Sequence, residues 1–265
     1  MSQKNEKRTK ISENFSSSTE YYHHNAGLQK RVAERLANAL EPWRYTVVDG
    51  PILEIGAGTG FFTKHLTVFF TNKRLIVSDI SNQMLEQCRK EVGKEKEISY
   101  RRLDAENFDF GKKKYALIAG NFVAQWFIHP GQTLLKMVEA LKPGGLLLVS
   151  FPGSESFSNW KSYCLDLGLP FTGNKLPDVE QVVIELSTGP VQVDFYEDTM
   201  TNRFDSVFEF FRHMKCTGSG TSQTGKKVTP KQLKLLNEYW LEKEQGQVEV
   251  HFHTAFVAAK RDHES

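Results

Sequence analysis

The sequence contains no apolar run that approaches the ~20 residues needed to span a bilayer, and its first ten residues are polar and basic without a hydrophobic stretch. These features predict a disordered tail over 1–14 rather than a secretory signal. The three cysteines lie far apart with no C-x-x-C pair, which favours a reducing compartment over a disulfide framework or a zinc cluster. Neither sign of charge is in large excess, since 34 basic and 32 acidic residues leave a net charge of +2. We therefore expect a soluble cytoplasmic chain that binds no metal, no membrane and no nucleic acid.

What the sequence does have is a glycine-rich turn after a short apolar run. Ile52–Ile55 leads into Gly56, Gly58 and Gly60, and a periodic apolar segment follows. This pattern predicts a buried strand, a tight turn and the start of a helix. Glycine permits positive φ and lets the backbone approach a ligand closely. The spacing is G-x-G-x-G, and Phe61 stands where the dinucleotide fingerprint has its third small residue.

A carboxylate follows the next predicted strand, 74–78. Asp79 lies nineteen residues after Gly60, and at this distance a strand-turn-helix-strand unit places a carboxylate beside a ribose bound over the first turn. A carboxylate accepts two hydroxyl hydrogen bonds, so it selects an unphosphorylated ribose. The alternative is that Asp79 caps the following helix, predicted over 81–92, but we favour the ribose.

Strands and helices alternate from Ile52 to Phe151, with strands expected near 51–55, 74–78, 98–103, 115–120 and 145–151. Alternation of this kind predicts an α/β fold with a parallel sheet covered on both faces. Ligands of such sheets bind at the carboxyl ends of the strands. Four polar residues fall at these ends and are the first candidates for a site, namely Glu54, Asp79, Asp104 and Asn121.

The segments that flank this region have their own patterns. An apolar stripe predicts a helix that precedes the first strand, with Leu28, Val32, Leu36 and Leu40 facing the core. Near the other end, Asp178 can cap a helix over 179–186, 191–196 alternates like a strand, and 248–259 predicts the closing strand.

About fifty residues, 197–247, separate the last two predicted strands. They hold two amphipathic helices, one over 206–214 and one beginning at Thr229 with Pro230 in its first turn. Between the helices, 217–222 forms a flexible polar stretch. Such an insert predicts a lid that excludes water from a reaction at the strand ends, and the alternative is a helical appendage packed on the sheet edge.

The central motifs together resemble those of class I methyltransferases that use S-adenosylmethionine. Glu54-x-Gly56-x-Gly58-x-Gly60 followed by Asp79 is similar to their cofactor motif. Residues 103–106 resemble the adenine-binding turn, Asn121 the fourth motif, and 142–149 the turn into the fifth strand. This resemblance covers roughly 45–151. It implies a Rossmann-like fold with a mostly parallel sheet of seven strands, helices on both faces, and a helical lid inserted before the last strand. The cofactor would be S-adenosylmethionine, with S-adenosylhomocysteine as product, and the residues implied to bind it are Glu54, Gly56, Ala57, Gly58, Gly60, Asp79, Ile80, Met84, Asp104, Ala105 and Asn121.

The acceptor decides whether such a reaction needs a base. An amine or hydroxyl must lose a proton, whereas a carboxylate is already ionised and needs only to be held by an Arg or Lys and neutral donors. Residues 121–126 lack the Asp/Asn-Pro-Pro-Tyr/Phe pattern that grips flipped bases in nucleic-acid amino-methyltransferases. They resemble instead the Asn-x-x-x-Gln-Trp segment of the malonyl-acyl-carrier-protein O-methyltransferases of early biotin synthesis.

Other segments extend this narrower resemblance to nearly the whole chain. They lie at Phe15 and Tyr22, Leu28-Gln29, 151–154, 176–177, 211–218, 229–233 and 250–259. The resemblance implies a malonyl thioester on acyl carrier protein or coenzyme A as substrate, whose free carboxylate is methylated without an acid or base. One departure is Ser17, where the family often has a basic residue; Tyr22 or backbone groups would then have to compensate in holding the cofactor's carboxylate.

The residues we expect to position the substrate are Tyr22, Gln125, Trp126 and Arg212. Arg212 is the choice for the carboxylate clamp, because a guanidinium pairs with a carboxylate in bidentate fashion. The alternatives are a solvated helix arginine at Arg212 and aromatic packing at Tyr22 and Trp126.

The expected partner is an acidic carrier protein, which a basic surface near the pocket mouth would dock. Candidate lysines are Lys215, Lys226, Lys227, Lys231 and Lys234, with a weaker cluster at 112–114. We expect a monomer. Rival interpretations are a methyltransferase for another small molecule and a non-catalytic subunit that binds S-adenosylmethionine. A nicotinamide dehydrogenase is disfavoured by Phe61.

Overall fold

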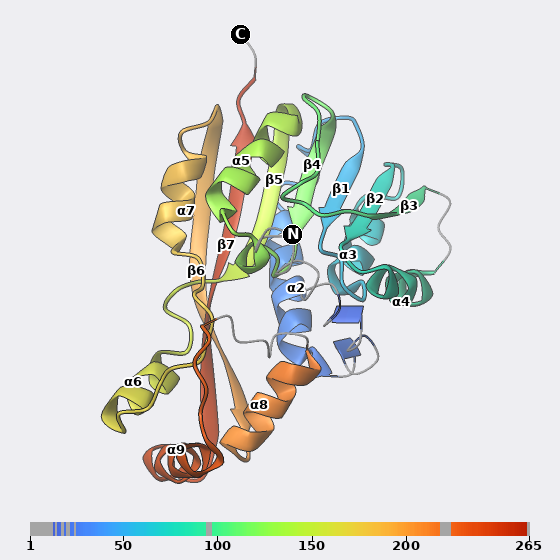
Figure 1. Cartoon of the computed structure of the whole chain (residues 1–265). Coiled ribbons are helices and arrows are strands. Elements are labelled where there is room, and N and C mark those ends of the chain that lie inside the picture. Colours follow the sequence, from blue (N-terminus) through green and yellow to red (C-terminus); the bar gives the residue numbers. More distant parts are fainter. Residues whose placement is uncertain are drawn as a thin grey trace.

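The computed structural model describes residues 13, 15, 16, 19, 22, 23, 25–93, 97–217 and 224–263 (Figure 1). The predicted tail, apart from Glu13, lies outside these residues, as do Ser17 and 218–222 of the predicted polar stretch. In the described chain, seven strands form one sheet in the order β3-β2-β1-β4-β5-β7-β6. Pairing is parallel from β3 to β5, and β7 is antiparallel to both of its neighbours. The strands are β1 (Ile52–Ile55), β2 (Leu75–Asp79), β3 (Ile98–Arg102), β4 (Tyr115–Gly120), β5 (Leu141–Pro152), β6 (Val191–Phe204) and β7 (Val248–Arg261).

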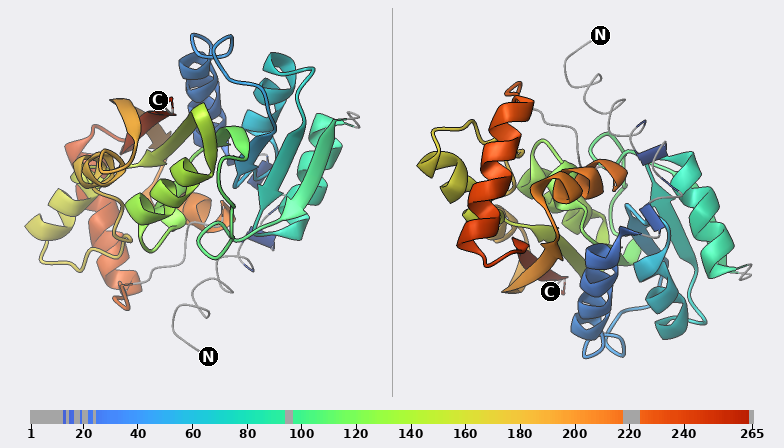
Figure 2. Two further views of the ribbon diagram at one scale, coloured as in Figure 1. Left: turned by 90° about the horizontal axis from the view of Figure 1, so that it is seen from above. Right: turned by 90° about the horizontal axis from the view of Figure 1, so that it is seen from below.

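Helices cover both faces of this sheet (Figure 2). One face is covered by α2 (Gly27–Leu40), α3 (Phe61–Phe69) and α4 (Asn82–Val92), and the other by α5 (Pro130–Ala140) and α7 (Val179–Leu186). Every residue of β1 and β4 is buried, as expected for parallel strands that are covered twice. The predicted α/β architecture is therefore confirmed. None of the helices in the described residues is long and apolar enough to cross a membrane.

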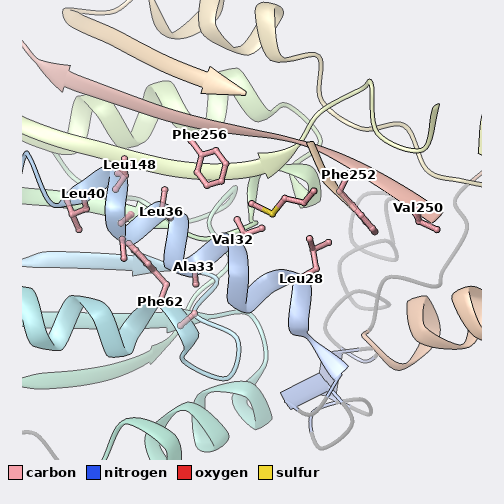
Figure 3. Close-up of a cluster of buried hydrophobic side chains, with 14 of the residues drawn as sticks. Leu28, Val32, Ala33, Leu36, Leu40, Phe62, Leu148, Val250, Phe252 and Phe256 are labelled. Atoms are coloured by element: carbon pink, nitrogen blue, oxygen red, sulfur yellow. The ribbon is translucent and has the colours of Figure 1, made fainter. Parts of the chain in front are cut away.

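The stripe on α2 forms the centre of one core. Leu28, Val32, Leu36 and Leu40 are all buried, and Figure 3 shows this row lying between Phe62 and the side chains of β5 and β7. Spacing by about one turn places the four side chains on one helix face, so the predicted stripe is confirmed. The helix thereby fixes its own position over the sheet.

The last strand pair is longer than the sequence indicated. The alternating pattern ended at Tyr196, but β6 continues to Phe204 and pairs with β7 along its whole length, from Val191↔Arg261 to Phe204↔Val248. The segment beyond Tyr196 is largely polar, so no alternation predicted it; its strand conformation comes from hydrogen bonds to β7, which do not depend on side-chain polarity. Because β5 pairs with β7 only as far as Pro152↔Thr254, the antiparallel pair of β6 and β7, called here the projecting hairpin, extends beyond the rest of the sheet (Figure 1).

Three helices surround this projecting hairpin, α6 (Ser158–Asp166), α8 (Val207–Cys216) and α9 (Pro230–Lys243). The two predicted helices are confirmed. Ser206 caps α8, and Thr229 and Gln232 form a capping box on α9. Phe210 and Trp240 are fully buried between them, so the insert has an apolar core of its own. No pattern in the sequence predicted α6.

Replacing Leu36 by alanine tests the role of α2. The side chain is fully buried, so its loss should lower the free energy of unfolding by about 3 kcal/mol, within the ~2–5 kcal/mol typical of buried leucine. Urea denaturation followed by circular dichroism measures this. The matched control is Asn38→Ala on the exposed face of the same helix, which should stay within ~0.5 kcal/mol of wild type. Equal effects of the two changes would contradict the packing described for α2.

Candidate cofactor and acceptor site

The strand order gathers the predicted polar residues at one edge. Four neighbouring strands, β3, β2, β1 and β4, run parallel, so their carboxyl ends lie side by side. Glu54 and Asp79 stand at the ends of β1 and β2, and Asp104 and Asn121 lie just beyond β3 and β4. The topology thus brings together side chains that are far apart along the chain.

The glycine turn has the backbone conformation that requires glycine. Gly56, Gly58 and Gly60 have φ of 65°, 55° and 94°, in the region that other residues rarely adopt. A side chain would also clash with its surroundings at two of these positions. A Cβ on Gly56 would lie 2.8 Å from the Val123 side chain, and a Cβ on Gly60 would lie 2.9 Å from the Cys88 sulfur. The result is a bare backbone bend between β1 and α3.

Asp79 is bonded to this bend. Its Oδ2 accepts a hydrogen bond from the Gly58 amide at 2.9 Å, and its Oδ1 accepts one from the Ser81 amide at 2.8 Å. The N-cap of α4 is Ser81, whose hydroxyl accepts from the Met84 amide, so Asp79 is not the capping residue. Burial raises the pKa of Asp79 even though backbone N–H groups stabilise its charge. Each oxygen keeps lone-pair capacity for a further donor such as a hydroxyl.

Glu54 lies beneath the same bend and is 1% exposed. The Thr63 hydroxyl donates to its Oε2 at 2.7 Å, whereas Oε1 is buried without a hydrogen-bond partner in the described chain. Burial raises the pKa of Glu54 to about 8, and the nearby charge of Asp79 adds to the shift. Two buried acids at close range are unfavourable alone and suit a site that receives a cation.

A chain of hydrogen bonds holds the end of β4. The side-chain amide of Asn121 donates to the backbone carbonyl of Gln29 at 3.1 Å. The Oδ1 atom of Asn121 accepts from the Ser150 hydroxyl at 3.1 Å. Ser150 in turn accepts from the amide of Phe122 at 2.9 Å, a residue with φ of 56°. Ser150 was not predicted, although a lone hydroxyl within the apolar run of β5 was a usable signal.

The other residues predicted for the cofactor lie around the ends of β1, β2 and β3. Ala57, Met84 and Ala105 are buried, and Ile80 is half-buried. Asp104 accepts from the Glu106 amide at 3.2 Å and from the Asn107 side chain at 2.9 Å. These bonds fix the turn after β3.

Tyr22 lies over the glycine turn. A Cβ on Gly58 would be 3.6 Å from its hydroxyl, and burial together with the charge of Asp79 raises the pKa of Tyr22. Ahead of it, Phe15 packs edge-on against Trp126 with ring centroids 5.0 Å apart, and the Ser16 hydroxyl lies 3.0 Å from that of Ser81. This N-terminal segment therefore crosses the carboxyl edge of the sheet.

A cavity of about 1050 Å³ extends from this edge to the lid. Three of the predicted substrate residues line it, namely Tyr22, Gln125 and Trp126. Arg212 is exposed and is not among the lining residues, although its neighbours Phe211 and His213 are. The structure thus places three of the four predicted substrate residues in the wall of one cavity.

The far wall of the cavity was not predicted. Trp160 of α6 and Phe252 of β7 line it and belong to an aromatic cluster in which Trp160 also contacts Phe211, with centroids 5.2 Å apart. These residues come together only because the hairpin projects past the sheet, a feature that sequence periodicity did not reveal. Burial lowers the pKa of His213 at the same wall, which favours its neutral form. Among the described residues, no group of three His, Cys, Asp or Glu side chains is arranged to hold a metal ion.

Residues 53–149 match a family model described as a methyltransferase domain. Two relatives are malonyl-[acyl-carrier protein] O-methyltransferases. That of Priestia megaterium is 30% identical over 227 residues, 80% of this chain and 81% of that protein. That of Halalkalibacterium halodurans is 26% identical over 241 residues, 87% of this chain and 89% of that protein.

Solved structures agree on the fold. YcgJ from Bacillus subtilis has a TM-score of 0.58 at 14% identity, with 91% of this chain and 100% of that chain covered. A methyltransferase from Thermotoga maritima that depends on S-adenosylmethionine has a TM-score of 0.53 at 15% identity, with 95% and 100% covered.

An acid bonded to a bare glycine bend, at the edge of a sheet with this strand order, defines a class I methyltransferase that uses S-adenosylmethionine. Similarity over most of both chains narrows the class. The chain belongs to the family of the malonyl-[acyl-carrier protein] O-methyltransferases. The predicted fold, family and cofactor are thereby confirmed.

The raised pKa of Glu54 predicts how stability depends on pH. The folded state holds this proton more tightly than the unfolded chain, so stability from Glu54 is full below its ordinary pKa of 4.5 and is lost as pH rises toward about 8. Glu54→Gln removes the titration. Its stability relative to wild type should therefore increase across this pH window, as measured by urea denaturation at several pH values.

The control for this prediction is Glu97→Gln, because Glu97 is exposed. This variant should follow the wild-type pH profile. A constant difference between Glu54→Gln and wild type at every pH would contradict the shifted pKa.

Proposed function

We propose that this protein transfers a methyl group from S-adenosylmethionine to the free carboxylate of a malonyl thioester, carried on acyl carrier protein or coenzyme A, in an early step of biotin synthesis. The observation that carries the proposal is a large cavity that opens at the carboxyl edge and is lined by Tyr22, Gln125 and Trp126. The relatives' activity supports the choice of acceptor.

The residues at the strand ends fit the cofactor. Asp79 would bind the ribose hydroxyls, Asp104 and Ala105 the adenine, and Glu54 and Asn121 the methionine half over the bare glycine turn. The unpartnered Glu54 oxygen and the open lone pairs of Asp79 support this assignment. When bound, the cofactor supplies a methyl group on a positively charged sulfur.

The chain's own task is to align the acceptor and keep the site dry. A malonyl carboxylate is ionised at neutral pH, so no general base is required. Gln125 and Trp126 would border the transfer position, and the aromatic wall of Trp160 and Phe252 would exclude water. Arg212 keeps its proposed role as the carboxylate clamp. Its side chain is exposed in this conformation, so the clamp needs a movement of α8.

A methyl-ester assay tests the function directly. Malonyl-carrier protein incubated with S-adenosylmethionine and the enzyme should gain one methyl group by mass spectrometry. Arg212→Ala should raise KM for the malonyl thioester by about tenfold or more, as expected for loss of a charged hydrogen bond, with little change in S-adenosylhomocysteine affinity.

Lys215→Ala on the same helix is the matched control and should leave turnover of malonyl-coenzyme A unchanged. Unaltered KM in Arg212→Ala would remove the clamp but not the function. Absence of any methyl ester would favour a methyltransferase for another small molecule, and binding of the cofactor without turnover of any acceptor would favour a non-catalytic subunit.

Lys226 and Lys227 would dock the acidic carrier protein, because both are exposed and both line the cavity. Replacing both with glutamate should raise KM for malonyl-carrier protein and weaken its dependence on salt, since the attraction is electrostatic. Turnover at increasing salt concentrations measures both effects.

The control pair is Lys112→Glu with Lys114→Glu. These residues precede the first residue of β4, so they lie at the sheet edge opposite the cofactor and should not affect turnover. Unchanged turnover and salt dependence in the Lys226, Lys227 variant would remove the docking surface.

The proposal also covers the organisation of the chain. Residues 15–265 would form a single domain in which α8 and α9, within the insert predicted over about 197–247, act as a helical lid. It would act as a monomer in the cytoplasm without membrane or nucleic-acid partners. The aromatic wall between lid and sheet supports the single domain.

A further inference from the structure

Gln29 carries a buried acceptor that no group of the described residues satisfies. The residue lies near the start of α2, is 8% exposed and lines the cavity. In the described chain its Oε1 is buried and has no hydrogen-bond partner. A buried amide oxygen without a donor destabilises the protein, so its presence in a cavity wall indicates a donor supplied by a ligand.

The surroundings place Gln29 beside the cofactor turn. Its backbone carbonyl accepts a hydrogen bond from the Asn121 side chain at 3.1 Å. This bond connects α2 to the end of β4. Ahead of α2 in the chain, Tyr22 lies against Gly58. Gln29 is therefore next to the β1 and β4 ends rather than at the distal wall formed by the lid.

A second acceptor in the same region points to the same ligand chemistry. Gln125 donates through Nε2 to the Phe122 carbonyl at 2.6 Å, and Phe122 donates to Ser150, which also bonds Asn121. The Gln125 Nε2 group is therefore already bonded, and Oε1 is the side-chain atom left for a ligand. Like the Gln29 oxygen, Gln125 Oε1 is buried and has no partner among the described residues. Both glutamines line the cavity.

The acceptor carboxylate cannot satisfy these oxygens, because it has no N–H or O–H to donate at neutral pH. A ligand ammonium has three such donors and a positive charge. We propose that Gln29 is a cofactor-binding residue whose Oε1 accepts a hydrogen bond from the ammonium group of the methionine half of S-adenosylmethionine. The inference rests on the proposed placement of the cofactor at the β1–β4 edge.

The test is a calorimetric comparison of Gln29→Met, which is nearly isosteric but lacks the oxygen, with wild type. S-adenosylhomocysteine should bind the variant about tenfold or more weakly, the effect of losing a hydrogen bond to a charged group. 5′-Methylthioadenosine has no ammonium and should bind both proteins equally. S-adenosyl-3-thiopropylamine keeps the ammonium without the carboxylate and should again bind the variant more weakly.

Stability gives a readout that a merely structural glutamine would not produce. Without ligand, Gln29→Met should have a higher Tm than wild type, because it removes a buried unsatisfied acceptor. Gln29→Glu retains an acceptor oxygen and should bind S-adenosylhomocysteine close to wild type, which covers the case in which Gln29→Met does not fold. Gln132→Leu is the matched control, since Gln132 lines the cavity but is exposed, and it should leave binding unchanged.

Four results would overturn the inference. Equal weakening of S-adenosylhomocysteine and methylthioadenosine would assign Gln29 a general structural role. Unchanged S-adenosylhomocysteine affinity with a raised KM for malonyl-coenzyme A, but not for a malonyl thioester without amides, would assign the donor to the acceptor's pantetheine arm. Wild-type protein that binds no S-adenosylhomocysteine would reject the cofactor site itself, whereas normal wild-type binding with an unaffected Gln29→Met rejects only the role of Gln29.

Discussion

The hydrogen bond from the Gly58 amide to the Asp79 carboxylate is the contact on which the site depends. It joins the turn after β1 to the end of β2 at 2.9 Å and requires a backbone with positive φ at Gly58. A side chain that prefers negative φ at this position would turn the amide away from Asp79. The same contact holds a carboxylate in a buried place where, without N–H donors, its charge would be strongly disfavoured.

Glu54 is a second buried acid beneath the same turn. Burial raises the pKa values of both Glu54 and Asp79, so the charged form of each acid carries a desolvation penalty. A positively charged ligand would offset it, and binding would then favour the ionised acids. Such a pair of acids would favour a positively charged ligand over an anionic one.

The features that depend on residues close in sequence could be predicted, whereas those that depend on tertiary contacts could not. The glycine turn, the strand ends and the Asp178 cap of α7 depend on neighbouring residues, so spacing alone predicted them. The polar second half of β6 depends on pairing with β7, and the contacts of Ser150 and Gln29 with Asn121 join segments that are remote in sequence. Arg212 illustrates the limit, because helical periodicity located α8 but did not determine which of its side chains lines the cavity.

Unpartnered buried groups separate structural from binding roles only when their location is considered. Trp240 Nε1 and His253 Nδ1 are also unsatisfied in the described chain, yet neither residue lines the cavity, and both belong to the packing around the projecting hairpin. Gln29 and Gln125 differ because their orphaned oxygens occur in the cavity wall. Both residues connect to Asn121, Gln29 through its backbone carbonyl and Gln125 through Phe122 and Ser150. An orphan in a core only lowers stability, whereas orphans held by one network beside a cavity indicate which chemical group is to enter it. Here that group is a donor, which fits the proposed cofactor ammonium at the β4 end and an acceptor carboxylate held from the side of the lid.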